Sequence, residues 1–168
     1  MQLGIRLHDI KKAPLEERLA IAKEQGFLCG HLALSKVISE YPVDDGALTP
    51  GYAMYLKKLF AKNGLDIAVL GCYLNLANPN EEQLAKITHR YLAHIRFASL
   101  LGVGVVGTET GAVNEEYKFE EKNHSDEALD IFIRNVKPVL SYAEKMGVIF
   151  AIEPVWKHIV CNPKRARK

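Results

Sequence analysis

Short apolar segments recur along the chain and alternate with longer segments of helical spacing. The apolar segments are residues 3–7, 30–34, 65–70, 103–106 and 148–152. Short runs that are apolar at nearly every position are typical of strands in a parallel sheet. The run at 148–152 is the clearest and is expected to be covered on both faces. Because Pro154 has no N–H for a sheet and favours an extended residue before it, this strand is expected to end at Glu153.

Four helices are expected between these strands. Pro14, the pair Thr49 and Pro50, and Asn80 mark helix starts, since Pro suits the first helical turn and Thr or Asn caps it. Each helix is expected to end at a glycine in the left-handed conformation. These glycines are Gly26, Gly64, Gly102 and Gly147, and they lie 38, 38 and 45 residues apart. The chain is therefore predicted to repeat a strand-helix unit with parallel strands.

Three features modify this pattern. Pro138 lies within the fourth helix and is expected to kink or split it. The polar segment 114–127 is longer than most connections and is a candidate lid. Asn162 and Pro163 indicate another helix start shortly before Lys168. The tyrosines of the second helix are expected to pack against the sheet, and the histidines of the third helix are expected to be ordinary helix residues.

The composition is that of an ordinary globular chain, 48% hydrophobic and 25% charged, and residues 1–168 are expected to form a single domain. The net charge of +2 argues against nucleic acid as a partner. Without an apolar run of roughly 18 residues or a signal peptide, we expect no membrane partner and a cytoplasmic location. Cys29, Cys72 and Cys161 lie far apart and are expected to be free thiols.

Polar residues that follow the expected strands form the candidate site, because parallel α/β folds place their chemistry at the carboxyl ends of strands. Glu153 and Glu109 end the fifth and fourth strands. The other candidates, for substrate contact, are His8, Asn75, Trp156 and His158. Structural alternatives remain open for three of these residues. Glu153 could pair with a surface lysine, and Glu109 could anchor a loop. Trp156 could be a packing residue, buried because its side chain is large and apolar.

Two α/β architectures fit five parallel strands. One is a doubly wound domain, and the other is the first part of a (β/α)8 barrel, which needs roughly 250 residues. The doubly wound fold predicts a glycine-rich phosphate turn after an early strand and a final covering helix, and the sequence contains neither. The pattern therefore favours parallel (β/α) units of a TIM barrel.

Several segments resemble the xylose-isomerase-like TIM-barrel superfamily, specifically its sugar phosphate isomerase/epimerase group. They are GIRLHD, LGCYLNLANP, ASLLGVGVVGTETG and AEKMGVIFAIEPVWKHIVCNPKRA. The resemblance covers nearly the whole chain but only about five of the eight units of such a barrel. The expected fold is therefore an incomplete barrel, truncated after the fifth strand.

The resemblance implies metal-assisted proton transfer through an enediolate, on a sugar or sugar phosphate. It implies a divalent metal at the mouth of the barrel, Mn or Mg first and Zn or Co as alternatives, held by Glu, Asp, His and Glu. Glu153 matches the first ligand and one half of the catalytic acid–base pair, and the other ligands would lie beyond Lys168. This chain alone is expected to hold the metal weakly or not at all.

An alternative hypothesis is a non-catalytic half-barrel. Five strands of a barrel leave two sheet edges and an apolar inner face uncovered, which favours association. Such a chain would pair with a second copy or need a partner that supplies the missing strands. Endonucleases and dehydratases with related barrels are further alternatives, and the lack of a basic surface disfavours the former.

Overall fold

The computed structural model describes residues 2–168 and contains one five-stranded parallel sheet in the order β1-β2-β3-β4-β5. The strands are β1 (Gly4–Arg6), β2 (Cys29–Ala33), β3 (Asp66–Gly71), β4 (Val105–Thr108) and β5 (Ile149–Ile152). Each strand overlaps the segment predicted from the apolar pattern. The sequential order and the parallel pairing are those of a partial (β/α)8 barrel, so the predicted fold class is confirmed.

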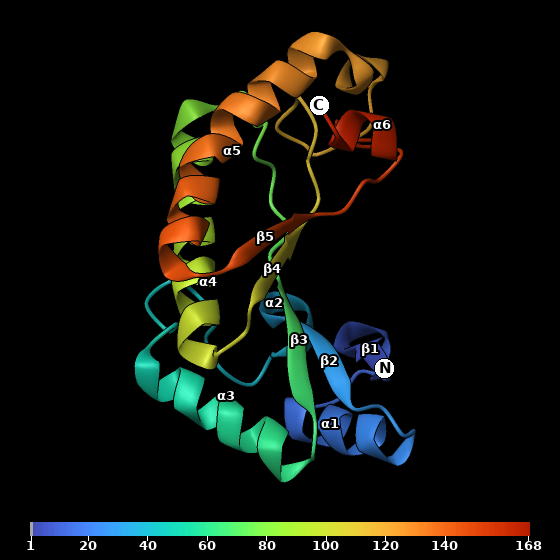
Figure 1. Cartoon of the computed structure of the whole chain (residues 1–168), viewed down its shortest axis with the longest axis vertical. Coiled ribbons are helices and arrows are strands. Elements are labelled where there is room, and N and C mark those ends of the chain that lie inside the picture. Colours follow the sequence, from blue (N-terminus) through green and yellow to red (C-terminus); the bar gives the residue numbers. More distant parts are fainter. Residues whose placement is uncertain (1) are drawn as a thin grey trace.

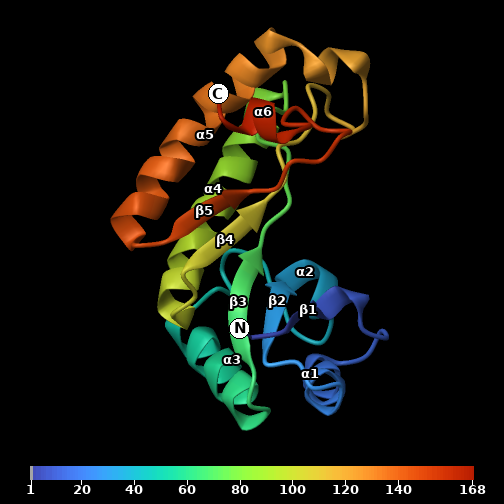
Figure 2. The same ribbon diagram turned by 45° about the vertical axis from the view of Figure 1, so that its right-hand side comes forward.

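Most of the helices connect successive strands, and the longer ones lie along one side of the sheet (Figure 1). They are α1 (Leu15–Glu24), α2 (Leu34–Val37), α3 (Pro50–Lys62), α4 (Glu81–Leu101), α5 (Asp126–Met146) and α6 (Pro163–Ala166), with short 3-10 helices η1 (Leu7–Asp9) and η2 (Glu121–His124). Figures 1 and 2 show α3, α4 and α5 on the same side of the strands, and none of the helices within residues 2–168 crosses the opposite face. That uncovered face corresponds to the inside of a barrel.

The predicted helix ends are confirmed. The glycines that follow α1, α3, α4 and α5 have positive φ, and they are Gly26 (82°), Gly64 (68°), Gly102 (73°) and Gly147 (66°). The side chains of Thr49, Asn80 and Asn162 each accept a backbone N–H from the first turn of their helix. These local signals fix where each helix stops and where the next strand begins.

The prediction that the fifth strand is covered on both faces is wrong. Ile149 in β5 is 67% exposed, whereas Phe150, its neighbour on the other face, is buried against the helices. The reason is that a barrel strand is covered on its inner face by the strands opposite it. Five strands curve too little to provide that cover, so the inner side chains of β5 meet solvent.

The helix with Pro138 is continuous, so the expected split does not occur. α5 extends from Asp126 to Met146 with the proline inside it. Its buried residues lie on both sides of the proline, and they are Ala128, Leu129, Phe132, Val136, Val139 and Ala143. α5 packs on α4 and β5, and its stripe is buried on both sides of the proline, which keeps the two halves of the helix together.

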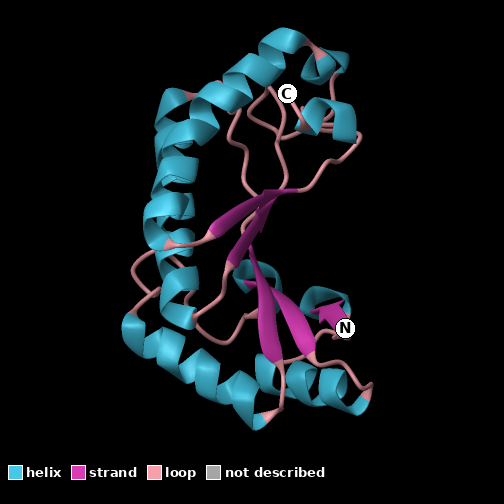
Figure 3. Cartoon of the chain, viewed as in Figure 1, coloured by secondary structure: helices cyan, strands magenta, loops and turns pink. Residues whose placement is uncertain are grey.

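A buried hydroxyl network connects α4 to the ends of β3 and β4. The hydroxyl of Tyr91 lies 2.5 Å from Thr108 Oγ1, donates to Leu74 O at 2.9 Å and accepts from Leu74 N at 3.0 Å. Tyr91 and Thr108 are fully buried. Loops extend beyond these strand ends, as Figure 3 shows, and the network fixes where they start.

Candidate functional site

A cavity of about 250 Å³ lies on the inner face of the sheet toward the carboxyl ends of the strands. Its lining comes from all five strands and the segments that follow them: Arg6, His31, Val69, Tyr73, Val105, Gly107, Thr108, Ala151, Ile152 and Glu153. Small residues, Gly107 and Ala151, form its floor on β4 and β5. The polar side chains at its rim give the cavity its chemistry, and we call it the mouth cavity.

Strand register brings the first polar residues together. Arg6 of β1 pairs with His31 of β2, and His31 pairs with Val69 of β3. The hydroxyl of Tyr73, two residues beyond the end of β3, lies 2.8 Å from His31 Nε2. Gly71 makes this contact feasible, because a Cβ there would overlap the imidazole and lie 2.7 Å from the Tyr73 ring.

An imidazole and a lysine lie close to the His31–Tyr73 pair. The ring of His8, in η1, packs edge-on against His31 with centroids 5.4 Å apart. Lys36 Nζ lies 4.4 Å from the centre of the Tyr73 ring. Nδ1 of His8 is buried and has no hydrogen-bond partner among residues 2–168. His8 therefore lies beside the mouth cavity and contacts its lining through His31.

Burial keeps the His31–Tyr73 pair uncharged at neutral pH. It is the main cause that lowers the pKa of His31 to about 4, and electrostatic interactions with His8, Arg6 and Lys36 add to the effect. Burial, followed by the negative charges of Glu153 and Glu109, raises the pKa of Tyr73 to about 12. The pair therefore presents a neutral imidazole and a protonated phenol, which can donate or accept hydrogen bonds.

Glu153 follows β5 directly and is exposed at the rim of the mouth cavity. Its backbone N–H donates to Thr108 O at 2.8 Å, which continues the pairing of β4 and β5. Among the hydrogen bonds and ion pairs of residues 2–168, none involves the Glu153 carboxylate, and no lysine pairs with it. The carboxylate therefore faces the open side of the sheet with all its oxygen lone pairs free.

A second polar group lies beyond β4. The Tyr117 hydroxyl donates to Glu109 Oε2 at 3.4 Å, and His158 Nδ1 lies 3.7 Å from the same oxygen. The rings of Tyr117 and His158 are 5.1 Å apart. Burial lowers the pKa of His158, while the charges of Glu109 and Glu153 act in the opposite direction. Tyr117 has a φ of 57°, a conformation that is costly for a bulky side chain and concentrates at functional sites.

The candidate lid, residues 114–127, is bonded to the segment that follows β5. Asn123 Nδ2 donates to Lys157 O at 3.2 Å, and a ring nitrogen of His124 lies 2.7 Å from Trp156 O. Arg165 of α6 donates to His124 O and to the carbonyl of the next residue at 2.9 and 2.7 Å. These bonds hold the segment as a wall beside the carboxyl ends of β4 and β5.

Two predicted contact residues lie apart from the mouth cavity. Asn75 is buried, its Nδ2 donates to Asn114 O at 2.8 Å, and its Oδ1 accepts the N–H groups of Ala77 and Ala112. Trp156 is 62% exposed and packs against Phe119, with ring centroids 5.1 Å apart. The roles of Asn75 and Trp156 in substrate binding remain predictions.

The site also contains four residues that the sequence did not single out, namely Arg6, His31, Tyr73 and Tyr117. Arg6 and His31 interrupt apolar strands, and Tyr73 follows the third strand as His8 follows the first. Polar residues at inward positions of predicted barrel strands were therefore an available signal. No sequence pattern marks Tyr117 as a site residue, because the position of its side chain depends on the path of the loop.

The residues of this chain do not fit a metal site by themselves. Among residues 2–168, no three or more His, Cys, Asp or Glu side chains lie together in a way that could hold a metal ion. Glu153 supplies one carboxylate, while a hard divalent cation takes about six oxygen ligands or keeps several waters. The predicted role of Glu153 as a metal ligand therefore remains a prediction.

Comparisons with known structures support the barrel interpretation. The IOLI protein with a bound zinc atom matches with a TM-score of 0.74 at 19% identity, over 99% of this chain and 56% of its own. D-psicose 3-epimerase from Clostridium cellulolyticum H10, determined with D-tagatose, matches with a TM-score of 0.67 at 17% identity, over 92% and 52%. A xylose isomerase-like TIM barrel protein from Mycobacterium smegmatis, in complex with magnesium, matches with a TM-score of 0.68 at 17% identity, over 99% and 59%.

The model of the xylose isomerase-like TIM barrel family matches residues 19–168, and the chain belongs to this family. The predicted resemblance is thus confirmed. The chain spans a little over half the length of the similar structures. A search of curated proteins found no match. Among the described residues 2–168, none of the helices has the length and apolar character needed to cross a membrane.

Proposed function

We propose that this chain provides the proton-transferring carboxylate of a sugar isomerase or epimerase, and that Glu153 is that group. The observation that carries the proposal is the free Glu153 carboxylate at the rim of the mouth cavity, immediately after β5. Moving a proton between adjacent sugar carbons requires a base beside a C–H next to a carbonyl. An unpartnered carboxylate at the rim of a cavity is suited to that role.

The neighbours of Glu153 in the mouth cavity are suited to the rest of the substrate. Arg6 lines the cavity and is paired with Asp9 at 2.8 and 3.0 Å, so this ion pair would lie beside the oxygens of an enediolate. The neutral His31–Tyr73 pair can bind sugar hydroxyls, since each hydroxyl both donates and accepts a hydrogen bond. The ring of His8 contacts His31 edge-on and helps to hold this pair in place.

We place the second polar group on the opposite side of the substrate. Glu109 and His158 are the predicted contacts there, and Tyr117 joins them through its hydroxyl. A sugar or sugar phosphate is the substrate class that the fold family supports. Asn75 would act by holding the loop wall in place, and Trp156 would contact substrate only from the exposed surface.

A divalent metal ion, Mn, Mg, Zn or Co, belongs to this proposal as a cofactor of the complete fold. Similar structures are described with zinc and with magnesium. Since Glu153 is the single ligand that this chain was predicted to supply, further ligands would have to come from outside residues 2–168. We therefore derive no chemical step through a metal. The expected cytoplasmic location and the expected absence of nucleic acid and membrane partners are parts of the same proposal.

The test compares Glu153→Gln with the wild-type residue in a completed barrel. The chain is joined to the C-terminal half of a similar barrel and assayed with added Mn²⁺ on a panel of ketoses and ketose phosphates. We expect turnover of at least one ketose and a loss of roughly 10²–10⁴-fold in Glu153→Gln, the usual contribution of a catalytic acid or base. Glu24→Gln, on the exposed end of α1, is the control. Turnover that survives Glu153→Gln contradicts the proposal.

A second candidate function is association through the open sheet, and the exposure of Ile149 favours it. β1 and β5 are the two edges of the sheet, and the inner face carries half-exposed apolar side chains. A second copy of the chain could cover both. Sedimentation equilibrium tests this candidate: a dimer that dissociates in Ile149→Lys supports it, and a well-folded monomer contradicts it.

A further inference from the structure

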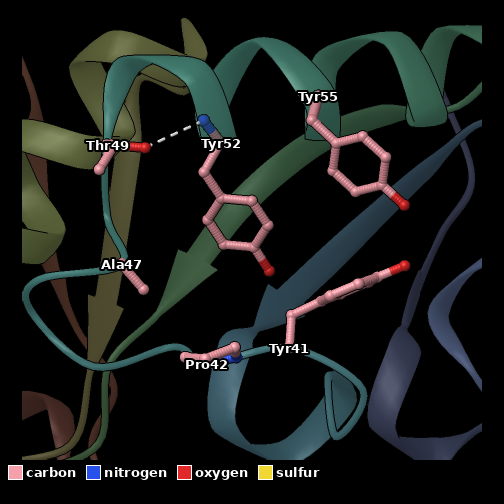
Figure 4. Close-up of a pocket in the computed structure, with 6 residues that line it drawn as sticks. All are labelled: Tyr41, Pro42, Ala47, Thr49, Tyr52 and Tyr55. Atoms are coloured by element: carbon pink, nitrogen blue, oxygen red, sulfur yellow. Dashed lines mark hydrogen bonds between the residues drawn. The ribbon is translucent and has the colours of Figure 1, made fainter.

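A second cavity lies on the helix side of the sheet, between α3 and the segment that precedes it. It has a volume of about 450 Å³ and is lined by Tyr41, Pro42, Ala47, Thr49, Tyr52 and Tyr55 (Figure 4). None of these residues lines the mouth cavity. The prediction that the tyrosines of this helix pack against the sheet is wrong for these two, because Tyr52 and Tyr55 face the cavity. We call it the tyrosine pocket.

Three aromatic rings form two walls of the tyrosine pocket. The rings of Tyr52 and Tyr55 are nearly parallel, with an interplanar angle of 11° and centroids 6.2 Å apart. Tyr41 is turned by 76° from Tyr55, with centroids 6.0 Å apart. In Figure 4 the first two rings present their faces to the viewer while the ring of Tyr41 is seen edge-on below them. The rings therefore make a corner at nearly a right angle.

The walls are held in place by contacts outside the pocket. Tyr52 packs on Phe97 of α4, with ring centroids 5.7 Å apart. Arg90 pairs with Asp45 at 2.6 Å and also donates to Val43 O, which fixes the loop that carries Tyr41. The Thr49 hydroxyl accepts the Tyr52 N–H at 3.2 Å, which fixes the start of α3. The corner is therefore preformed, as ligand sites usually are.

The surroundings of the tyrosine pocket favour positive charge. Its lining contains no lysine, arginine or histidine. Although burial acts in the opposite direction, backbone N–H groups of Leu15 and Ser39 hold the pKa of Glu40 below its ordinary value, so this carboxylate is ionised. Burial, followed by Tyr55 and the negative charge of Glu40, raises the pKa of Tyr52 to about 12. Glu40 directly precedes Tyr41, so its negative charge lies next to the lining of the pocket.

One polar group of the tyrosine pocket lacks a partner. The Tyr52 hydroxyl is buried and forms no hydrogen bond with any of residues 2–168. Figure 4 shows it directed toward the space between Tyr52 and Pro42. Buried hydroxyls in native structures are nearly always hydrogen-bonded, so this one points to a group that enters the pocket.

We propose that the tyrosine pocket binds a small N-methylated ammonium ion, whose charged group rests in the corner made by Tyr41, Tyr52 and Tyr55. The faces of aromatic rings attract a cation electrostatically, and N-methyl groups suit walls of tyrosine and proline. A hydroxyl or amine elsewhere on the ligand can satisfy Tyr52. The site is independent of the proton-transfer function proposed for the mouth cavity.

The test titrates the 168-residue chain with choline and with 3,3-dimethylbutan-1-ol by isothermal calorimetry. The alcohol has the shape of choline but carries no charge. A cation–π contribution of about 1 kcal/mol predicts that choline binds about fivefold more tightly. Equal or tighter binding of the alcohol overturns the proposal, because the pocket would then select shape alone. The absence of binding by either compound also overturns it.

A pair of variants assigns the binding to the aromatic corner. Tyr41 is 47% exposed, so its replacement leaves the fold intact, which circular dichroism checks. Tyr41→Phe keeps the aromatic face and is expected to retain the choline affinity within about twofold. Tyr41→Leu removes the face and is expected to lose the preference for choline over the alcohol. Undiminished preference in Tyr41→Leu would exclude the corner as the site.

Discussion

The hydroxyl of Tyr73 lies 2.8 Å from Nε2 of His31, across the ends of two neighbouring strands. This contact joins residues 42 positions apart in the sequence and forms the polar centre of the mouth cavity. It exists because Gly71 has no side chain at the position between the two rings. The geometry of the candidate site therefore depends on one small residue.

Gly71→Ala is expected to separate His31 from Tyr73 and to destabilise the fold by about 1–3 kcal/mol, the usual cost of inserting a methyl group into a packed site. Urea denaturation measures the change. Gly104→Ala is the matched control, because a Cβ there meets no atom within 4 Å. Equal stability of the two variants would show that the His31–Tyr73 contact is loose enough to absorb a methyl group.

Asn75→Ala is expected to lower the free energy of unfolding by about 1–3 kcal/mol, because it leaves the buried N–H groups of Ala77 and Ala112 without their acceptor. Thermal or urea unfolding measures this loss. If the stability of the variant is unchanged, the Asn75 side chain is not needed to hold these N–H groups and is available to bind substrate.

Stability is expected to fall between pH 6.5 and pH 4 because of neutral histidines in the fold. Burial is the main cause that lowers the pKa values of His94 and His31 to about 4. In this range the unfolded chain binds protons that the folded chain does not, so the free energy of unfolding decreases as the pH decreases. Each such histidine contributes a slope of up to about 1.4 kcal/mol per pH unit.

The variant His94→Gln checks this assignment, because glutamine cannot titrate. Urea unfolding at pH 8, 6.5, 5.5 and 4.5 should give a shallower decline for the variant than for the wild-type chain, whatever their difference at pH 8. Parallel declines over the whole range would mean that the His94 imidazole takes up its proton equally well in the folded chain.

Local signals predicted the scaffold. The positions that end the helices, Gly102 for example, have a left-handed backbone conformation that few side chains tolerate, and the apolar runs between them predict parallel strands. Glu153 could be placed at the end of β5 for the same reason, since Pro154 ends the strand. These features depend on the nearest few residues, so the sequence contains them directly.

The rest of the site depends on distant contacts. His31 was not recognised because its significance comes from Tyr73, which strand register and Gly71 bring to it. Ile149 was expected to be buried, since a strand segment carries no information on how many strands face it. Tyr117 reaches Glu109 through a loop whose path is fixed by hydrogen bonds of Asn114 and Asn123.

The most direct test of the central claim is deuterium incorporation into a ketose at the carbon next to the carbonyl, measured by NMR in D₂O with the completed barrel. The account predicts that the wild-type protein incorporates deuterium, and that Glu153→Gln reduces the rate by roughly 10²–10⁴-fold while Glu24→Gln does not. Incorporation at the wild-type rate in Glu153→Gln would contradict the account, because the proton would then be moved by another group.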